Sequence, residues 1–230
     1  MPPRVFLLRH GEAQHNVGPP PPPDHDLLDP ELTSRGITQC QAIPNTYPHF
    51  FASLSPDNTL IIVSPLRRTI QTLLLGFSAH LPHTNDSTET PSIPLKILPE
   101  LQECGSWPCD TGGPLALTKA RFASAPFLDW SECEAQPDWN LKRGKYEATE
   151  EKNVARAKWI RRWIRERKED KVVLVGHHGI LRRIVKAPNA HDRLLSPIQW
   201  ENAELREFAF KDLTGEDDEA DLIRVAGSIL

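Results

Sequence analysis

Residues 5–16 read VFLLRHGEAQHN, and the rest of the chain can be arranged around them. The first four are apolar, which is typical of a strand buried on both faces inside a parallel sheet covered by helices. The run ends at Arg9, His10 and Gly11, where a guanidinium, an imidazole and a flexible glycine meet. Ligand sites in open α/β sheets lie just beyond the carboxyl ends of the strands. The stretch therefore predicts a central strand with a cationic site at its end.

Two later stretches repeat this arrangement of an apolar run followed by basic or imidazole side chains. Residues 60–63 (LIIV) lead into two arginines, and residues 172–175 (VVLV) lead into two histidines. If these strands are parallel neighbours, they bring His10, Arg68 and His177 to the same edge of the sheet. Grouped cations repel one another and add little to a stable core, but they can pair with the oxygens of a dianionic phosphate. We therefore expect a phosphate site at this edge.

Strand-like and helix-like stretches alternate along the chain. Short apolar or alternating runs predict strands at 5–8, 60–63, 95–98, 172–175, 203–210 and 222–225. Helical patterns occupy four segments. The first covers 37–43 and halts at Pro44, and the second begins at Pro65 after a cap at Ser64 and ends near Gly76. The other two cover 146–169 and 180–185. This alternation predicts an α/β fold, a three-layer sandwich with a mostly parallel central sheet and helices on both faces.

Two segments interrupt the alternation. Residues 100–145 contain repeated prolines and glycines and little periodicity, over a stretch too long for an ordinary connection. We expect them to form a lid or substrate-facing insertion with short helices, inside one domain that spans residues 1–230. Residues 18–23 read GPPPPP, which favours a polyproline II arm. The arm (19–23) either stiffens a surface loop or serves as a ligand for a partner domain.

Composition narrows the class of protein. The chain has 230 residues, of which 39% are hydrophobic, enough to bury the core of one large domain. A net charge of -4 lacks the basic footprint of a nucleic-acid binder. No apolar run approaches the roughly 20 residues of a membrane span, and we expect no signal peptide before the first strand. The four cysteines show neither CxxC spacing nor a disulfide framework. We expect a cytoplasmic protein with reduced thiols and with no nucleic-acid or membrane partner.

Several short motifs together resemble the histidine phosphatase superfamily, also called the phosphoglycerate mutase-like family. The matching stretches are LRHGE at 8–12, Asn16, LTSRG at 32–36, SPLRRTIQT at 64–72, Glu103 in LQE, and HHG at 177–179. The resemblance covers residues 5 to about 185. The conjunction of these motifs is far more specific than any one of them, and it implies the same kind of α/β fold as the alternation of strands and helices.

The resemblance also implies a role for each matching side chain. His10 is similar to the nucleophile that becomes phosphohistidine, and Glu103 to the proton donor for the leaving oxygen, with Asp110 as the alternative donor. The implied phosphate pocket consists of Arg9, Arg68, His177 and Asn16, with Arg67 a less favoured substitute for Arg68. Trp107 and Asp110 either meet the leaving group or form a structural turn. His178 either lines the substrate site or merely packs.

These roles imply a phosphomonoester hydrolase that needs no metal and no cofactor. A neutral imidazole would attack phosphorus, the cations would neutralise the phosphoryl oxygens, and a carboxylic acid would supply the proton. Zinc at His177 and His178 is disfavoured, because no third ligand lies near them in the sequence.

Two alternatives stay open at this point: phosphoryl transfer of the phosphoglycerate mutase type, and a non-catalytic phosphate-binding adaptor on the same scaffold. The stretch CGSWPCDTGG at 104–113 differs from the segment that follows the acid in phosphoglycerate mutases. It looks similar to a fungal and yeast branch of phosphatases in the superfamily. We therefore expect a phosphatase for a small-molecule phosphomonoester, whose specificity lies in residues 100–145.

Overall fold

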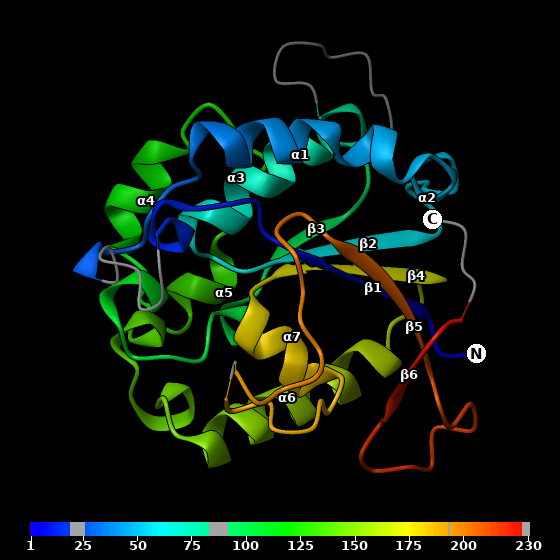
Figure 1. Ribbon diagram of the computed structural model, residues 1–230. Helices are drawn as coiled ribbons and strands as arrows, with labels where there is room; N and C mark the ends of the chain where they lie inside the picture. The colour runs from blue at the N-terminus through cyan, green and yellow to red at the C-terminus, as the bar shows by residue number, and fades with distance from the viewer. Residues whose placement is uncertain (19–25, 83–91, 193, 227–230) are drawn as a thin grey trace.

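The computed structural model describes residues 1–18, 26–82, 92–192 and 194–226, so the polyproline residues 19–23 lie outside the described part. A single sheet of six strands runs through its centre in the order β3-β2-β4-β1-β5-β6 (Figure 1). The strands are β1 (Arg4–Arg9), β2 (Thr59–Val63), β3 (Leu95–Ile97), β4 (Lys171–Gly176), β5 (Leu205–Phe210) and β6 (Leu222–Arg224). The first four neighbours in this order pair in parallel, whereas β5 and β6 add antiparallel strands at one edge. The sheet is therefore mostly parallel, as predicted.

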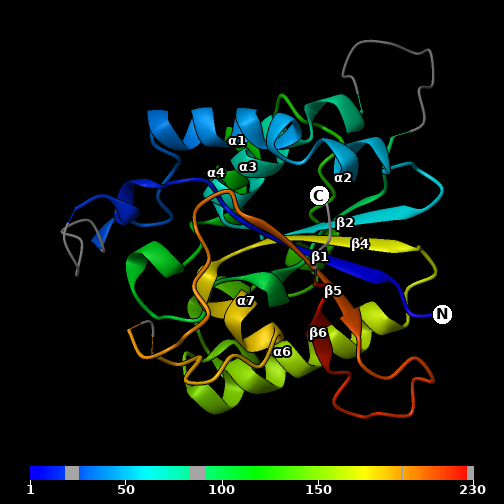
Figure 2. The ribbon, with the colours of Figure 1, turned by 45° about the vertical axis from the view of Figure 1, so that its right-hand side comes forward.

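Helices cover both faces of this sheet (Figures 1 and 2). One face carries α1 (Ser34–Thr46), α2 (Pro48–Ala52) and α3 (Arg67–Gly76), and the opposite face carries α6 (Glu150–Arg165) and α7 (His178–Ile184). Two shorter helices, α4 (Leu115–Arg121) and α5 (Ser131–Glu134), lie in the segment between β3 and α6. Single 3-10 turns occupy Gln14–Asn16, Ser78–His80, Pro99–Leu101, Pro108–Asp110, Trp139–Leu141 and Gly144–Tyr146. The three-layer α/β sandwich predicted from the sequence is confirmed.

Successive side chains of each central strand enter two different cores. In β1, Phe6 and Leu8 pack in the cluster formed with α1 and α3, while Val5 and Leu7 pack in the cluster formed with α6 and α7. Because strand side chains alternate between faces, only a continuously apolar strand can serve both clusters. This is why the uninterrupted run at the start of the chain becomes a strand at the centre of the sheet.

Several helix boundaries differ from the sequence prediction, and α6 is shorter at both ends than the predicted 146–169. Helix α1 does not halt at Pro44 but runs through it to Thr46, because the N–H of Tyr47 still reaches the carbonyl of Ile43 at 3.0 Å beyond the proline. Helix α3 begins at Arg67 without a side-chain cap, so the predicted cap at Ser64 is wrong. The Ser64 hydroxyl instead contacts a histidine of the site described below, and Asp29 Oδ1 accepts the first N–H of α3 at 3.0 Å.

The segment 100–145 contains short helices and turns, as expected, and it packs on the sheet as part of the fold. Phe122, Cys133 and Trp139 belong to the same buried cluster as α1 and α3. Its function as a lid stays a prediction. Among the residues that the structure describes, no helix is long and apolar enough to cross a membrane.

Candidate functional site

The carboxyl ends of β1, β4 and β2 bring the sequence-predicted residues together. Arg9 pairs with Gly176 in the parallel register of β1 and β4, so the next residues, His10 and His177, follow the two strands side by side. Their ring centroids lie 5.2 Å apart. Strand β2 ends beside β4 and delivers Ser64 and α3 to the same edge. The convergence that the sequence predicted is therefore present in the structure.

The His10 imidazole is buried, and its hydrogen bonds determine which nitrogen carries a proton. Nδ1 lies 2.6 Å from the carbonyl oxygen of Gly11, which can only accept, so Nδ1 bears the hydrogen. Nε2 therefore has a free electron pair, which accepts a hydrogen bond from Nε of Arg68 at 3.2 Å. Burial, followed by the charges of Arg68 and Arg9, lowers the pKa of His10 well below 6.5. A neutral imidazole with an exposed electron pair on Nε2 can act as a nucleophile.

His177 is fully buried beside His10 and is held by Ser64. Its Nε2 lies 2.8 Å from the hydroxyl oxygen of Ser64, which in turn accepts the N–H of Leu66 at 3.5 Å. The hydroxyl can donate its hydrogen to Nε2, and in that tautomer the proton of His177 lies on Nδ1. Among the described residues, buried Nδ1 has no hydrogen-bond partner. Burial, and then the charge of Arg68, lowers the pKa of His177 well below 6.5, so this ring is neutral.

Two buried guanidinium groups supply the positive charge. Nη1 of Arg9 donates to the carbonyl of Trp200 at 2.5 Å, and Nη1 of Arg68 donates to the carbonyl of Cys109 at 2.7 Å. Arg67 lies at the start of the same helix but turns to Asp29, with Nε 3.7 Å from Oδ2. The geometry therefore favours Arg68, and not Arg67, as the arginine of the phosphate pocket.

Asn16 lies at the site, but its carboxamide is engaged by neighbouring residues. Oδ1 accepts the N–H of Ala13 at 3.0 Å and the amide of Asn202 at 3.4 Å, and Nδ2 lies 3.1 Å from Nε2 of His15. Asn202 also donates to the carbonyl of His10 at 3.1 Å. Asn16 therefore braces the loop that carries His10, besides lining the cavity.

Sequence reasoning missed several residues of this site, among them Ser64, His15, Trp200 and Asn202. Ser64 directly follows the end of β2 and His15 lies in the first quoted stretch, so both were open to notice in the sequence. Trp200 and Asn202 lie beyond residue 185, where the motif resemblance ends, and they reach Arg9 and His10 only through tertiary contacts. No local pattern in the sequence marks them.

The carboxylate of Glu103 sits on the N-terminus of α7. Oε2 accepts the N–H of Gly179 at 2.9 Å, and Oε1 accepts those of Ile180 at 3.0 Å and Cys104 at 2.8 Å. Burial raises the pKa of Glu103, but the N–H groups of Gly179 and Cys104 and the charge of Arg68 outweigh it and hold the pKa below 4.5. Glu103 is therefore ionised near neutral pH.

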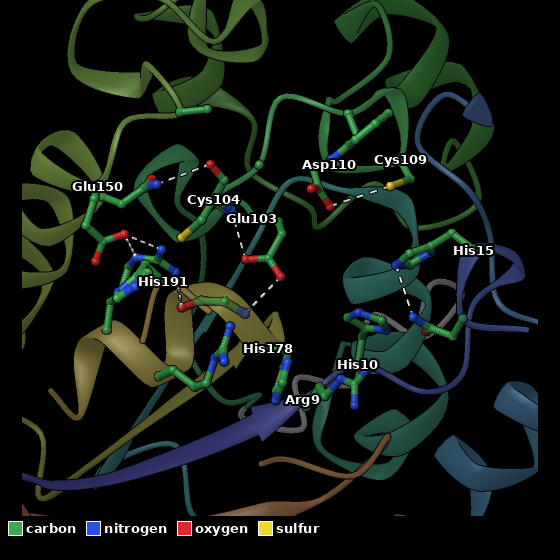
Figure 3. A pocket seen from close by; sticks show the side chains of 18 residues that line it. Arg9, His10, His15, Glu103, Cys104, Cys109, Asp110, Glu150, His178 and His191 are labelled. Carbon is green, nitrogen blue, oxygen red and sulfur yellow. Dashed lines mark hydrogen bonds and ion pairs between the residues drawn. The ribbon is translucent and has the colours of Figure 1, made fainter. Parts of the chain in front are cut away.

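The remaining predicted residues line one cavity of ≈ 510 Å³ together with Arg9, His10, Asn16 and Glu103 (Figure 3). Asp110 lies with Oδ1 3.8 Å from Nη2 of Arg68. His178 is the buried first residue of α7, and Trp107 is exposed at 56%. Glu150 and His191 lie on the side of the cavity away from His10 (Figure 3), and Asn153, Arg182 and Arg183 also line the cavity. The part of the chain that the structure describes contains no group of three or more His, Cys, Asp or Glu side chains placed to hold a metal ion.

Comparison with curated proteins finds relatives that span most of the chain. A probable phosphatase of Schizosaccharomyces pombe is 28% identical over 191 residues, which cover 83% of this chain and 81% of that protein. A phosphoglycerate mutase-like protein of Arabidopsis thaliana is 29% identical over 238 residues, which cover 90% of this chain and 84% of that protein.

Comparison with solved structures finds the same fold. An ecdysone phosphate phosphatase of Bombix mori, in complex with tungstate, matches with a TM-score of 0.56 and 19% identity, covering 90% of this chain and 89% of that one. A mycobacterial glucosyl-3-phosphoglycerate phosphatase matches with a TM-score of 0.52 and 19% identity, covering 96% and 97%. The family profile described as histidine phosphatase superfamily (branch 1) matches residues 5–216. With motifs, fold and profile in agreement over most of its length, the chain belongs to branch 1 of the histidine phosphatase superfamily.

Proposed function

We propose that this protein is a metal-independent phosphomonoester hydrolase that acts through a phosphohistidine on His10. The observation that carries the proposal is the state of that imidazole. It is neutral, its proton is held on Nδ1 by Gly11, and the electron pair of Nε2 points at the guanidinium of Arg68. A phosphate bound by Arg68 would place its phosphorus beside the nucleophilic nitrogen.

The reaction balances in two displacements. In the first, the electron pair of His10 Nε2 forms a bond to phosphorus, the ester P–O bond breaks, and the leaving oxygen takes a proton to become an alcohol. In the second, water attacks phosphorus and gives a proton to a carboxylate, the P–N bond breaks, and inorganic phosphate is released. The side chains of Arg9, Arg68 and His177 pair with the phosphoryl oxygens, so acceleration comes mainly from positioning and electrostatics.

We assign the proton transfers to Glu103. As an ionised carboxylate it is ready to accept the proton of the attacking water in the second displacement. In the first displacement it must be protonated, and a dianionic phosphate in the cavity favours this, because a nearby like charge raises the pKa of a carboxyl group. Asp110 lines the same cavity and is the alternative donor.

A second candidate function is phosphoryl transfer of the mutase type, since two Arabidopsis relatives are named phosphoglycerate mutase-like. Hydrolysis is supported by the Schizosaccharomyces pombe relative, which is named a probable phosphatase, and by the unlike segment 104–113. Incubation with 3-phosphoglycerate separates the two functions. A hydrolase releases inorganic phosphate from one or more members of a metabolite panel, whereas isomerisation without free phosphate would favour the mutase.

The covalent step provides the decisive experiment. Brief mixing with ³²P-labelled substrate, followed by a denaturing quench, should trap label that survives base and is lost in acid, the pattern of a phosphoramidate. His10→Ala should abolish this label, whereas His177→Ala should slow labelling but leave the acceptor in place. Acid-labile label that persists in His10→Ala would move the nucleophile to another histidine. Inversion at a chiral phosphate would exclude the two-step route, which requires net retention.

A further inference from the structure

An ammonium group contacts the main chain of Glu103. Nζ of Lys142 donates to the carbonyl oxygen of Glu103 at 2.7 Å. Lys142 follows the 3-10 turn Trp139–Leu141 with φ of 52° and ψ of 44°, the left-handed region that side chains other than glycine rarely adopt. The fold therefore accepts backbone strain at the residue that delivers this ammonium.

The surroundings make a charged group costly at this position. Lys142 is half-buried, and its desolvation, followed by the neighbouring guanidinium of Arg156, lowers its pKa to about 8, against the opposing charges of Asp110, Cys104 and Glu103. The peptide already has other donors, since Nη2 of Arg156 lies 3.4 Å from the Glu103 carbonyl. If the residue only filled space, an apolar side chain would be more stable here than a lysine, because an ion loses hydration on burial.

The other hydrogen bonds around Glu103 show what the lysine adds. Nδ2 of Asn153 donates to the carbonyl of Cys104 at 3.2 Å, and Nε2 of Gln102 donates to the carbonyl of Trp139 at 2.8 Å. A neutral side chain of α6 thus holds the carbonyl after Glu103, and the side chain of Gln102 joins this stretch to the turn at Trp139. Lys142 supplies a short, charged hydrogen bond to the carbonyl of Glu103 itself.

We propose that Lys142 is a positioning residue, whose ammonium charge fixes the peptide of Glu103 so that its carboxylate is presented for proton transfer to and from the reacting oxygens. This proposal rests on the proposed function, in which Glu103 moves those protons. It assigns Lys142 no contact with the phosphate, because the ammonium is engaged by the carbonyl oxygen of Glu103. Its loss should therefore change the chemical step and leave phosphate binding nearly intact.

The charge of Lys142 also gives the proposal a pH signature. The titratable and charged groups around it are Glu103, Cys104 and Asp110 of its own segment, Arg156 of α6, and His177 after β4. Lys142 has a pKa of about 8, and none of its neighbours with a known pKa shift titrates near this value. Burial raises the pKa of Cys104 to about 11, and the pKa values of His177 and Glu103 lie below 6.5. Deprotonation of Lys142 should therefore produce an alkaline decline in turnover of substrates that need a proton.

The test compares Lys142→Met and Lys142→Arg with Lys145→Met. Lys145 is a suitable control, since it lies three residues away, has a 60% exposed side chain and pairs with Glu100. We expect Lys142→Met to lower kcat on alkyl phosphates at least about tenfold, within the range of general acid–base catalysis, with KM changed less than about twofold. Nitrophenyl phosphate, whose leaving group needs little proton assistance, should be affected much less. Lys142→Arg should keep activity, and its turnover should stay level above pH 8, where that of the wild-type enzyme declines.

Several results would overturn the inference. Wild-type and Lys142→Arg enzymes with the same alkaline limb would show that the lysine charge is not used. Equal losses on both substrate classes in a folded Lys142→Met protein, or the same losses in Lys145→Met, would show a general structural effect. If Lys142→Met fails to fold, the pH profile of Lys142→Arg still decides. ¹³C-lysine NMR on the wild-type protein should find Lys142 titrating near pH 8, with an ordinary value counting against the proposal. A wild-type protein without phosphatase activity would instead refute the proposed function itself.

Discussion

Arg68 donates its Nε–H to Nε2 of His10 over 3.2 Å, so one guanidinium contacts the nitrogen that would attack phosphorus. The same guanidinium is anchored through Nη1 to the carbonyl of Cys109 at 2.7 Å. A planar fork can keep this anchor while its other N–H groups turn to phosphoryl oxygens, which a single ammonium cannot do. Under the proposed function, the pair would link orientation of the nucleophile to binding of the phosphate.

Replacing Arg68 by lysine should therefore be severe, although the charge is kept. We expect Arg68→Lys to lower kcat/KM on nitrophenyl phosphate by about 10²–10³-fold, the usual effect of removing one preorganised donor from a transition-state site. The adjacent Arg67 provides the matched control, because its side chain turns to Asp29. Arg67→Lys should stay within about threefold. Similar losses in both variants would reassign the phosphate-binding arginine.

Two glycines offer a way to displace each candidate acid without removing it. A Cβ at Gly179 would lie 2.4 Å from Oε1 of Glu103, and a Cβ at Gly105 would lie 2.1 Å from Oδ2 of Asp110. Both clashes involve the ends of flexible side chains, so each variant should fold. We expect Gly179→Ala to lower kcat on alkyl phosphates at least about tenfold while sparing nitrophenyl phosphate, and Gly105→Ala to have a small effect. The reverse result would make Asp110 the proton donor.

Direct removal of the acid should show the same selectivity. Glu103→Gln should reduce turnover of alkyl phosphates by about 10²–10⁴-fold and that of nitrophenyl phosphate much less. A Brønsted series of leaving groups provides the measurement, with a steeper dependence on leaving-group pKa in the variant. If all substrates slow equally, Glu103 has a role other than proton transfer.

The buried imidazoles should make stability depend on pH in a predictable direction. The pKa values of His10 and His177 are lowered well below 6.5 by burial and then by Arg68, so the folded protein keeps both rings neutral when the unfolded chain takes up protons. As pH falls from 6.5 to 5.5, the free energy of unfolding should drop by up to about 1.4 kcal/mol per pH unit for each such histidine. Urea unfolding of wild type and His177→Gln checks this, because the variant should show a shallower slope. Identical slopes would contradict the lowered pKa of His177.

The contact of Asn202 with the nucleophile loop should contribute modestly. Asn202→Ala removes the hydrogen bond to the His10 carbonyl at 3.1 Å and the contact with Asn16. The usual net value of one hydrogen bond corresponds to a loss of about two- to tenfold in kcat/KM. Asn45→Ala, at an exposed position of α1, is the control and should have no effect. An unchanged rate in Asn202→Ala would show that Ala203, whose N–H also reaches this carbonyl, suffices.

Activity should not depend on a metal ion. Arg9 and Arg68 supply the charge that a metal would otherwise provide, so hydrolysis of nitrophenyl phosphate should survive prolonged incubation with EDTA. Metal analysis of the purified protein should accompany this assay. Activity that disappears with chelator and returns with zinc or magnesium would refute the metal-free mechanism.

Much of the architecture follows from the sequence, because the apolar or polar character of each residue indicates whether its position is buried. The apolar runs in β1, β2 and β4 must serve cores on both faces, so they become central parallel strands, and parallel strands bring their carboxyl ends to one edge. That is enough to place His10, His177 and Arg68 together. The choice of Arg68 over Arg67 as the phosphate-binding arginine came from a resemblance of motifs, and the contact between Arg67 and Asp29 supports this choice.

Tertiary structure alone decided the chemical state of these groups and the residues that support them. Ser64 has the sequence of a helix cap, yet its hydroxyl serves His177, and Asp29 takes over the helix N-terminus. The pKa of Glu103 is held low by the N–H groups of Gly179 and Cys104 and by Arg68, and the pKa of Lys142 is lowered by desolvation and then by Arg156. Local patterns record how apolar a position is. Protonation and orientation depend instead on hydrogen bonds and desolvation between segments far apart in the chain, which exist only once the fold has formed.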